Sequence, residues 1–287
     1  MSLVDECGDG NLDNVEALLS QGRDPNTPQQ SGVTPLLAAA YNGHLPVVQI
    51  LIGHGVELDA TDDKGWTALA TVARLGHGQV AAILLENGAN PNIENEDNTP
   101  PLMFAVSSGN PQISSSLLKF GADLNRRLTD GWSYPLIAAQ IGSEPTLQVL
   151  AEFGADFQVS DDRGITPLMT AAKEGHVEAT VFLLESGVDV DQVTPDSFSA
   201  LVLAAHAGHE NVIKALIEFG ADIHLCDNTG FDALMSAAFG GHIHTVRSLV
   251  DSGSNIAHTS RDGHTAKTVA ASQGHHCIVK YLDLISK

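Results

Sequence analysis

The chain has 287 residues and carries 35 Asp and Glu residues against 14 Lys and Arg residues, which gives a formal net charge of −21. A charge of this sign argues against binding to the phosphate backbone of nucleic acids, which Lys and Arg side chains neutralise. It favours a basic partner, although the need for solubility also explains an acidic surface.

Membrane insertion and secretion are not expected from the sequence. No apolar run of about 18 residues is present, so there is no candidate membrane span, and no basic-then-apolar leader opens the chain. The three cysteines, Cys7, Cys226 and Cys277, are scattered and include no C-x-x-C pair. We therefore expect free thiols and a cytoplasmic protein.

Leucines and glycines recur through the whole chain with a period of 33 residues and without insertion. Nine leucines form one column: Leu18, Leu51, Leu84, Leu117, Leu150, Leu183, Leu216, Leu249 and Leu282. Nine glycines form a second, the glycine column: Gly10, Gly43, Gly76, Gly109, Gly142, Gly175, Gly208, Gly241 and Gly274. Such a period indicates stacked copies of one small unit.

Residues 32–59 show the unit most clearly. Thr34 followed by Pro35 predicts a helix start, because the hydroxyl caps free amides and proline is preset for the first helical position. Gly43 predicts a left-handed cap, so this first helix should end at about Asn42. A second helix then carries one apolar stripe, formed by Val47, Val48, Leu51 and Ile52.

The second helix should end at Gly55, and an extended turn should follow to Gly65. Alanine pairs recur in the first helix of most copies: Ala39-Ala40, Ala138-Ala139, Ala171-Ala172, Ala204-Ala205, Ala237-Ala238 and Ala270-Ala271. Small side chains let neighbouring helices approach to about 8–10 Å between axes. Each copy is then expected to bury its apolar stripe against the next copy.

This pattern resembles the ankyrin repeat family, whose repeat reads roughly G-x-T-P-L-H-x-A-A-x-x-G-H, then a V-V-x-x-L-L helix, then G-A-D-V-N. Residues 164–176 read G-I-T-P-L-M-T-A-A-K-E-G-H, and residues 121–125 read G-A-D-L-N. The resemblance implies an all-α solenoid of paired antiparallel helices with protruding β-turn or hairpin loops. The family histidine after T-P-L is absent, as at Met169, which puts in doubt only the hydrogen bond of that histidine.

The domain prediction is a single array over residues 1–287. Residues 1–27 are expected to be an N-terminal capping repeat, because Glu6-Cys7 replaces the alanine pair and presents a charge where a neighbour would pack. Residues 28–260 hold seven central repeats. Residues 261–287 form a C-terminal capping repeat, in which Lys267 occupies the place of a consensus leucine.

The repeat pattern is weakest near the middle of the chain. Asn98 and Ser197 stand for turn glycines, Pro100 stands for the capping threonine, and Pro135 stands for a core leucine. Departures of this kind mark sites where function or strain overrides the repeat. Drift tolerated by strong neighbouring copies is the alternative.

No catalytic, cofactor-binding or metal-binding chemistry is predicted. Six histidines follow the glycine column at the start of the second helix and lie too far apart for zinc ligation: His44, His77, His176, His209, His242 and His275. The sequence holds no nucleophile elbow, phosphate loop or H-E-x-x-H motif. We therefore expect a protein that is not an enzyme and that takes no cofactor.

Positions that the period does not dictate are the candidates for partner binding. They are the residue before the Thr-Pro pair and the two residues before the glycine column, and the resemblance places both on the concave face. The candidates are Tyr41, Trp66, Arg74, Leu75, Trp132, Ile141, Phe198, Phe231 and Phe239. Aromatic anchors are typical of binding hot spots. The alternative is that these aromatic side chains only brace the adjoining turns.

Six acidic turn residues lie close to these positions in the sequence: Asp63, Asp97, Asp130, Asp162, Asp196 and Asp262. They predict a basic partner with an apolar stripe. Asn26, Asn92 and Asn125 resemble the asparagines that are hydroxylated in animal ankyrin repeats, and turn formation is the other interpretation.

Two functions remain open after this reading. The first is a non-catalytic scaffold or adaptor that binds a protein partner through the concave face and is monomeric by itself. The second is an architectural or self-associating repeat array, either a spacer or a homo-oligomer. Neither interpretation involves nucleic acid or a membrane.

Overall fold

The computed structural model of the protein describes residues 2–286, apart from the side chain of Thr129. Within this range the regular structure is α-helical, with one 3₁₀ turn and two isolated β-bridges, Val193 with Ser199 and Cys226 with Asp232. Two compact parts are distinguished, Met1–Leu124 and Asn125–Lys287. The all-α prediction is confirmed.

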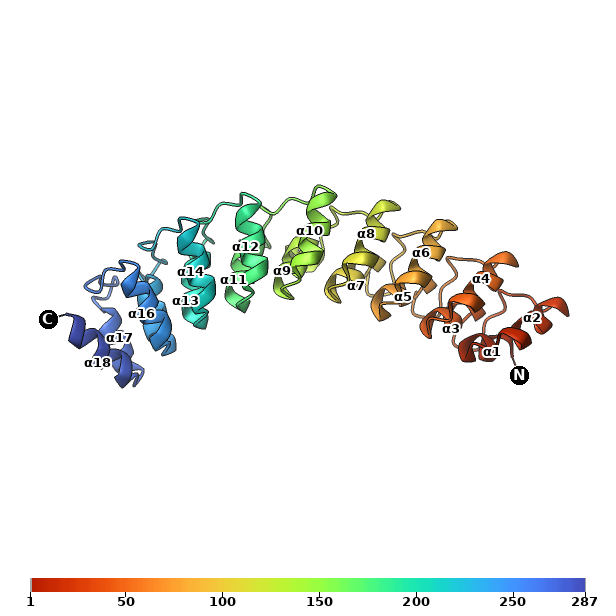
Figure 1. Ribbon diagram of the computed structural model, residues 1–287, viewed down its shortest axis with the longest axis horizontal. Helices are drawn as coiled ribbons and strands as arrows, with labels where there is room; N and C mark the ends of the chain where they lie inside the picture. Colours follow the sequence, from red (N-terminus) through yellow and green to blue (C-terminus); the bar gives the residue numbers. More distant parts are fainter. Residues whose placement is uncertain (1, 287) are drawn as a thin grey trace. The chain divides into compact units, whose positions relative to one another are not determined.

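The N-terminal part is a series of helix pairs (Figure 1). Its helices are α1 (Leu3–Asp9), α2 (Leu12–Ser20), α3 (Pro35–Tyr41), α4 (Leu45–Gly53), α5 (Ala68–Leu75), α6 (Gly78–Glu86), α7 (Pro101–Ser107) and α8 (Pro111–Lys119). Odd-numbered helices are the first of each pair, and each contacts the next odd-numbered helix, while even-numbered helices contact one another in the same way. Two layers of helices result.

The C-terminal part repeats this arrangement. It contains η1 (Thr129–Gly131), α9 (Tyr134–Gln140), α10 (Glu144–Glu152), α11 (Pro167–Glu174), α12 (Val177–Glu185), α13 (Ala200–Ala207), α14 (Glu210–Glu218), α15 (Ala233–Gly240), α16 (Ile243–Asp251), α17 (Ala266–Ser272) and α18 (His276–Ile285). The first helices α9, α11, α13, α15 and α17 contact one another in sequence, as do the second helices α10 to α18.

The ends of α3 follow the predicted capping chemistry. The Thr34 hydroxyl accepts a hydrogen bond from the backbone N–H of Leu37 at 3.2 Å, and Pro35 is the first helical residue. The helix ends at Tyr41, one residue before the predicted end, and Gly43 follows with a φ of 71°. A φ in this region is accessible to glycine without the clash that a side chain creates.

The core lies between the two layers of each part. Seven of the column leucines, from Leu51 to Leu249, are fully buried at 0% exposure. The alanine pairs are buried as well, except that Ala271 in the last copy is exposed. Because seven successive copies bury the column leucine against their neighbours, stability is distributed along the array.

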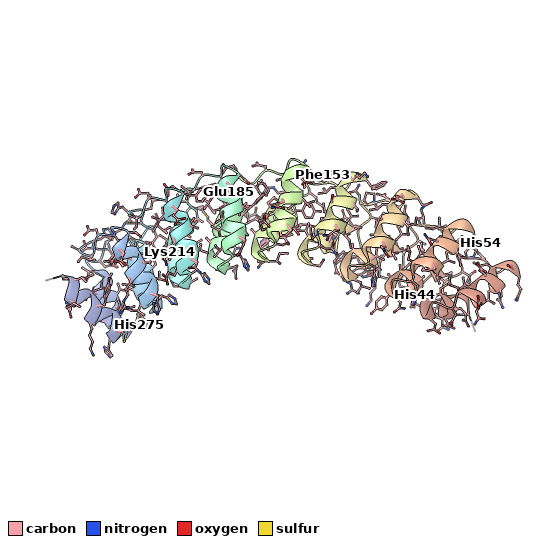
Figure 2. The ribbon with its side chains drawn as sticks, viewed as in Figure 1. His44, His54, Phe153, Glu185, Lys214 and His275 are labelled. Carbon is pink, nitrogen blue, oxygen red and sulfur yellow. The ribbon has the colours of Figure 1, made fainter. Side chains whose placement is uncertain are left out.

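The histidine column joins successive copies. Each of its six rings donates from Nε2 to a backbone carbonyl in the first helix of the preceding copy. The bond is 3.0 Å for His44 to Gly8, 3.1 Å for His77 to Tyr41, and 3.0 Å for His275 to Phe239. His44 and His275 are labelled in Figure 2. Asn110 and Ser143 occupy this column in two central copies and cap their own helices instead.

The glycine column is what lets these rings approach. A Cβ atom on Gly43 would lie 2.8 Å from Nδ1 of His77, which is closer than real contacts allow. The column therefore serves two purposes, a left-handed cap within a copy and space for the next copy.

The turns between copies are joined by a second set of bonds. The Oδ1 atom of Asn26 accepts from the backbone N–H of Glu57 at 2.8 Å, and Asn92 accepts in the same way from Asp123 at 2.9 Å. The amide nitrogen of Asn92 also donates to the carbonyl of Gly121 at 2.9 Å. Both asparagines thus support the turns, as the second interpretation of these residues expects.

The two residues that replace turn glycines, Asn98 and Ser197, adopt the left-handed backbone conformation of the glycines at the same repeat position. Asn98 has a φ of 55° and Ser197 a φ of 63°, while Gly65 and Gly164 at the same repeat position have φ values of 75° and 79°. Asparagine tolerates this region better than serine does. Ser197 is therefore a site of local backbone strain.

Ser197→Gly should raise the free energy of unfolding by about 1 kcal/mol, because glycine removes the left-handed penalty. The exposed hydrogen bond from the Ser197 hydroxyl to Asn228 is lost, but such a bond contributes less than the strain. Urea denaturation of both proteins measures the difference. Ser186→Gly, at a φ of −72° and also with one exposed side-chain hydrogen bond, to the Phe182 carbonyl, is the matched control and should give no gain. A loss of stability in Ser197→Gly would contradict the interpretation.

Candidate functional site

The predicted partner-binding residues all lie at the turn tips or at the ends of first helices, and we call this surface the first-helix face. Four of them are large exposed apolar side chains: Tyr41 at 54%, Phe239 at 42%, Leu75 at 39% and Ile141 at 38% exposure. Trp66, Trp132, Phe198 and Phe231 precede first helices and are half-buried. The residues therefore divide into open helix-end side chains and partly covered turn aromatics.

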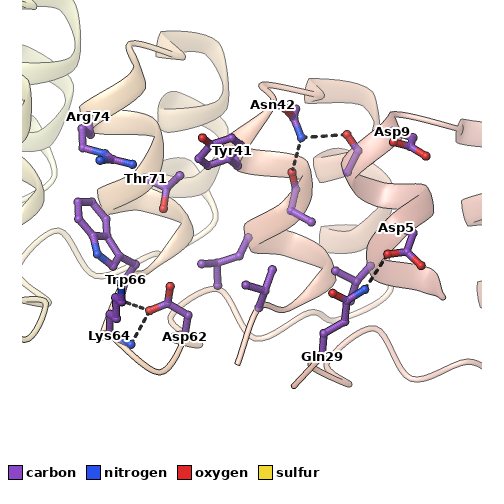
Figure 3. Close-up of a pocket in the computed structure, with 15 residues that line it drawn as sticks. Asp5, Asp9, Gln29, Tyr41, Asn42, Asp62, Lys64, Trp66, Thr71 and Arg74 are labelled. Carbon is purple, nitrogen blue, oxygen red and sulfur yellow. Dashed lines mark hydrogen bonds between the residues drawn. The ribbon is translucent and has the colours of Figure 1, made fainter. Parts of the chain in front are cut away.

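A groove in the N-terminal part brings three of the candidates together. Tyr41, Trp66 and Arg74 line a cavity of about 850 Å³ that spans α1, α3 and α5 and the turns before α3 and α5. Figure 3 shows Arg74 and Trp66 at one end of this N-terminal groove, Asp5 and Asp9 at the other, and Tyr41 between them.

The carboxylate of Asp62 closes the turn before α5 and thereby positions Trp66. Oδ1 of Asp62 accepts from the backbone N–H groups of Lys64 and Trp66, each at 2.9 Å. The indole then packs on Phe104 with a centroid distance of 4.7 Å, and the Arg74 guanidinium lies 4.6 Å from the indole centroid. Trp66 thus contacts both Phe104 and Arg74 and braces the turn, and both Trp66 and Arg74 line the groove.

Carboxylates occupy the opposite end of the N-terminal groove. Asp5 accepts hydrogen bonds from the Ser2 hydroxyl at 2.7 Å and from the Gln29 amide at 2.8 Å. These bonds, that of Ser2 first, lower the pKa of Asp5 below its ordinary value. Asp9 is exposed one helical turn further along α1. This end of the groove is negatively charged at neutral pH.

A second groove lies in the C-terminal part. Phe198, Phe231 and Phe239 line a cavity of about 360 Å³, together with Val202, Leu203 and His206. The His206 ring stacks on Phe239 with centroids 5.9 Å apart and an interplanar angle of 23°. Asp227 closes the turn before Phe231 and accepts its N–H at 2.9 Å. This C-terminal groove is apolar and suits a large apolar side chain of a partner.

Leu75, Trp132 and Ile141 line neither groove. Trp132 follows a turn in which Leu128 takes the place of the closing acid. The Leu128 N–H donates to the Trp132 carbonyl at 2.8 Å, and the Arg127 guanidinium donates to the Gly131 carbonyl at 3.2 Å. Leu75 and Ile141 are exposed at helix ends outside both grooves, and Trp132 is half-buried beside its turn. The six acidic turn residues predicted to flank the site are all exposed.

Sequence reasoning missed the anionic end of the N-terminal groove. Asp9 directly precedes the glycine of the first copy, which is the same repeat position as Asn42. The rule that selected Tyr41 and Arg74 would have found it. The first copy is predicted to be a capping repeat, yet its helix α1 contacts α3 and lines the groove.

Within residues 2–286, no group of three or more His, Cys, Asp or Glu side chains is arranged to hold a metal ion. The three cysteines are unpaired, as predicted. None of the described helices combines the length and hydropathy needed to cross a bilayer.

Comparison with known families gives a match along the chain. A family profile described as ankyrin repeats in three copies matches residues 3–95, 102–194, 135–227, 182–260 and 201–283. The overlapping matches reflect the uniform repeat spacing. No curated protein matches the chain.

The three thiols should react at very different rates in the folded protein. Burial first, and the neighbouring Glu6 charge second, raise the pKa of Cys7 to about 12, whereas Cys277 is exposed. Burial also raises the pKa of Cys226. Because the thiolate is the reacting form, a disulfide reagent at pH 8 should label Cys277 first and Cys7 only after unfolding.

Mass spectrometry of the labelled protein locates each modification, and Cys277→Ser is the control that should remove the fast phase. Labelling of Cys7 at the rate of Cys277 under native conditions would contradict the burial of α1 against α3.

Proposed function

The chain belongs to the ankyrin repeat family, whose members generally bind other proteins, and we propose that it is a non-catalytic scaffold that binds a protein partner through the first-helix face. The exposed side chains at the ends of first helices carry this proposal. Tyr41 and Phe239 occupy the same repeat position, six copies apart, and each lines one of the two grooves. Exposed aromatic side chains beside a cavity are the usual anchors of a protein interface.

The charge of the surface supports a basic partner with an apolar stripe. The net charge is −21, and Asp63, Asp97, Asp130, Asp162, Asp196 and Asp262 are all exposed on the turns. Complementary charge increases the rate of association and selects partners. The same charge disfavours nucleic acid and anionic membranes. We propose a cytoplasmic protein that is monomeric without its partner.

A self-associating array is the second candidate, and one observation favours it. Phe120, Phe153 and Phe219 recur at the ends of second helices and are exposed at 39%, 38% and 42%. They form an apolar set on the opposite layer from the first helices, and Phe153 is labelled in Figure 2. Contacts between copies of the chain through these rings would build an oligomer.

Two double variants separate these functions, because they remove similar exposed rings from opposite layers. Tyr41→Ala/Phe239→Ala should reduce capture of the partner from a cell extract about tenfold or more, since each truncated hot-spot residue costs more than 1 kcal/mol. Phe153→Ala/Phe219→Ala should leave capture unchanged. Quantitative mass spectrometry of the captured proteins and thermal unfolding of each variant provide the measurement and the folding control.

Sedimentation of the wild-type protein at several concentrations completes the test. A constant monomer mass supports the scaffold. A mass that rises with concentration, and that falls back in Phe153→Ala/Phe219→Ala, would replace the scaffold with the self-associating array.

A further inference from the structure

We propose that the N-terminal groove binds an extended segment of the partner protein that carries opposite charges at its two ends. A Lys or Arg of this segment faces Asp5 and Asp9, an apolar side chain lies on Tyr41, and an Asp, Glu or C-terminal carboxylate pairs with Arg74. The inference rests on the proposed function and specifies which partner sequence the first-helix face selects.

Arg74 is the first ground for this proposal. Its guanidinium stacks on Trp66 at 4.6 Å, and among the described residues no carboxylate lies within ion-pair distance of it. Arg74 is exposed at the end of α5, so its charge is open to an external group. Stacking fixes the plane of the guanidinium and leaves its N–H groups for an external carboxylate, which they bind in pairs.

The opposite end of the groove has the reverse charge. Asp5 is held by Ser2 and Gln29, which are neutral, and Asp9 forms no ion pair within the part of the chain that the structure describes. Both carboxylates are exposed on α1. Complementarity therefore calls for a cation at this end of the occupant.

The middle of the groove presents an exposed aromatic ring. Tyr41 is 54% exposed at the end of α3 and stands between the two charged ends (Figure 3). Val33 and Leu37 line the wall beside it. An apolar side chain of the occupant can cover the Tyr41 ring and remove this area from water.

The spacing of the helices sets the spacing of the charges. α1, α3 and α5 are successive neighbours, and helices packed at about 8–10 Å place α1 and α5 about 16–20 Å apart. An extended chain rises about 3.3 Å per residue, so the two charges of the occupant should stand about five or six residues apart. A helical occupant rises about 1.5 Å per residue and would need about 11–13 residues between them.

Selection from a random library of displayed 16-residue peptides tests the proposal on the full chain. Wild-type protein should enrich peptides in which a basic and an acidic residue flank an apolar one at the extended spacing. Arg74→Glu should abolish the preference for the acidic residue and keep that for the basic one. Arg247→Glu is the matched control, because Arg247 also stacks on an aromatic ring, Tyr281, at 5.3 Å and lies outside the groove.

Synthetic copies of an enriched peptide give the magnitude. Arg74→Glu should weaken binding about tenfold or more, the range for loss of a charge-assisted pair, and Arg247→Glu should leave it unchanged. Arg74→Gln, which keeps a planar group on Trp66 and removes the charge, should also weaken binding. Circular dichroism checks that each variant is folded.

The outcomes separate this inference from the proposed function. Enrichment without an acidic preference, enrichment at the helical spacing, an equal effect of Arg74→Glu and Arg247→Glu, or no enrichment would overturn the charged-segment proposal. If Tyr41→Ala abolishes peptide binding while Arg74→Glu does not, only the charge pattern fails. If enriched peptides bind Tyr41→Ala and Arg74→Glu as tightly as they bind the wild-type protein, binding through this face fails as well.

Discussion

The close approach of each copy to the next is the constraint on which the rest of this structure depends. At Gly43 a side chain would collide with the ring of His77, and that ring must reach the Tyr41 carbonyl. Glycine is therefore required for both its conformation and its lack of a Cβ atom. The same contact recurs in most copies and holds them at one spacing. Even spacing brings the ends of successive first helices into one row in each part, and this row supplies the walls of both grooves.

Most of this architecture could be predicted from the sequence because each signal is local. Thr34-Pro35 starts a helix and Gly43 ends it through chemistry that involves only neighbouring residues, and α3 has the expected bounds within one residue. The bonds of the histidine column could not be predicted in this way. Their acceptors are backbone carbonyls 36 residues earlier in the chain, and a carbonyl carries no sequence signal. The period revealed that the histidines recur, but only the packing of two copies shows what each ring binds.

The candidate site, too, could be predicted from the sequence only where local signals determine it. Removal of the periodic positions left Tyr41, Arg74 and Phe239, which do line grooves, but it also left Trp132 and Ile141, which line neither. Contacts between turns and helices determine which of these residues line a groove. Trp66 contacts Phe104 and Arg74, so the residue that was chosen as an anchor also supports a cation that lines the groove. Trp66 and Arg74 belong to one copy and Phe104 to the next, so the complete stack forms only when two copies pack together.

Repeat positions hold the fold, and we propose that the first-helix positions bind a partner. Amide chemical shifts of the isotopically labelled protein, recorded during titration with a captured partner, test this division most directly. We predict that the largest shift changes lie at the ends of α3, α5 and α15 and in the turns that precede these helices. Changes concentrated around Phe120, Phe153 and Phe219, at the ends of the second helices, would contradict it.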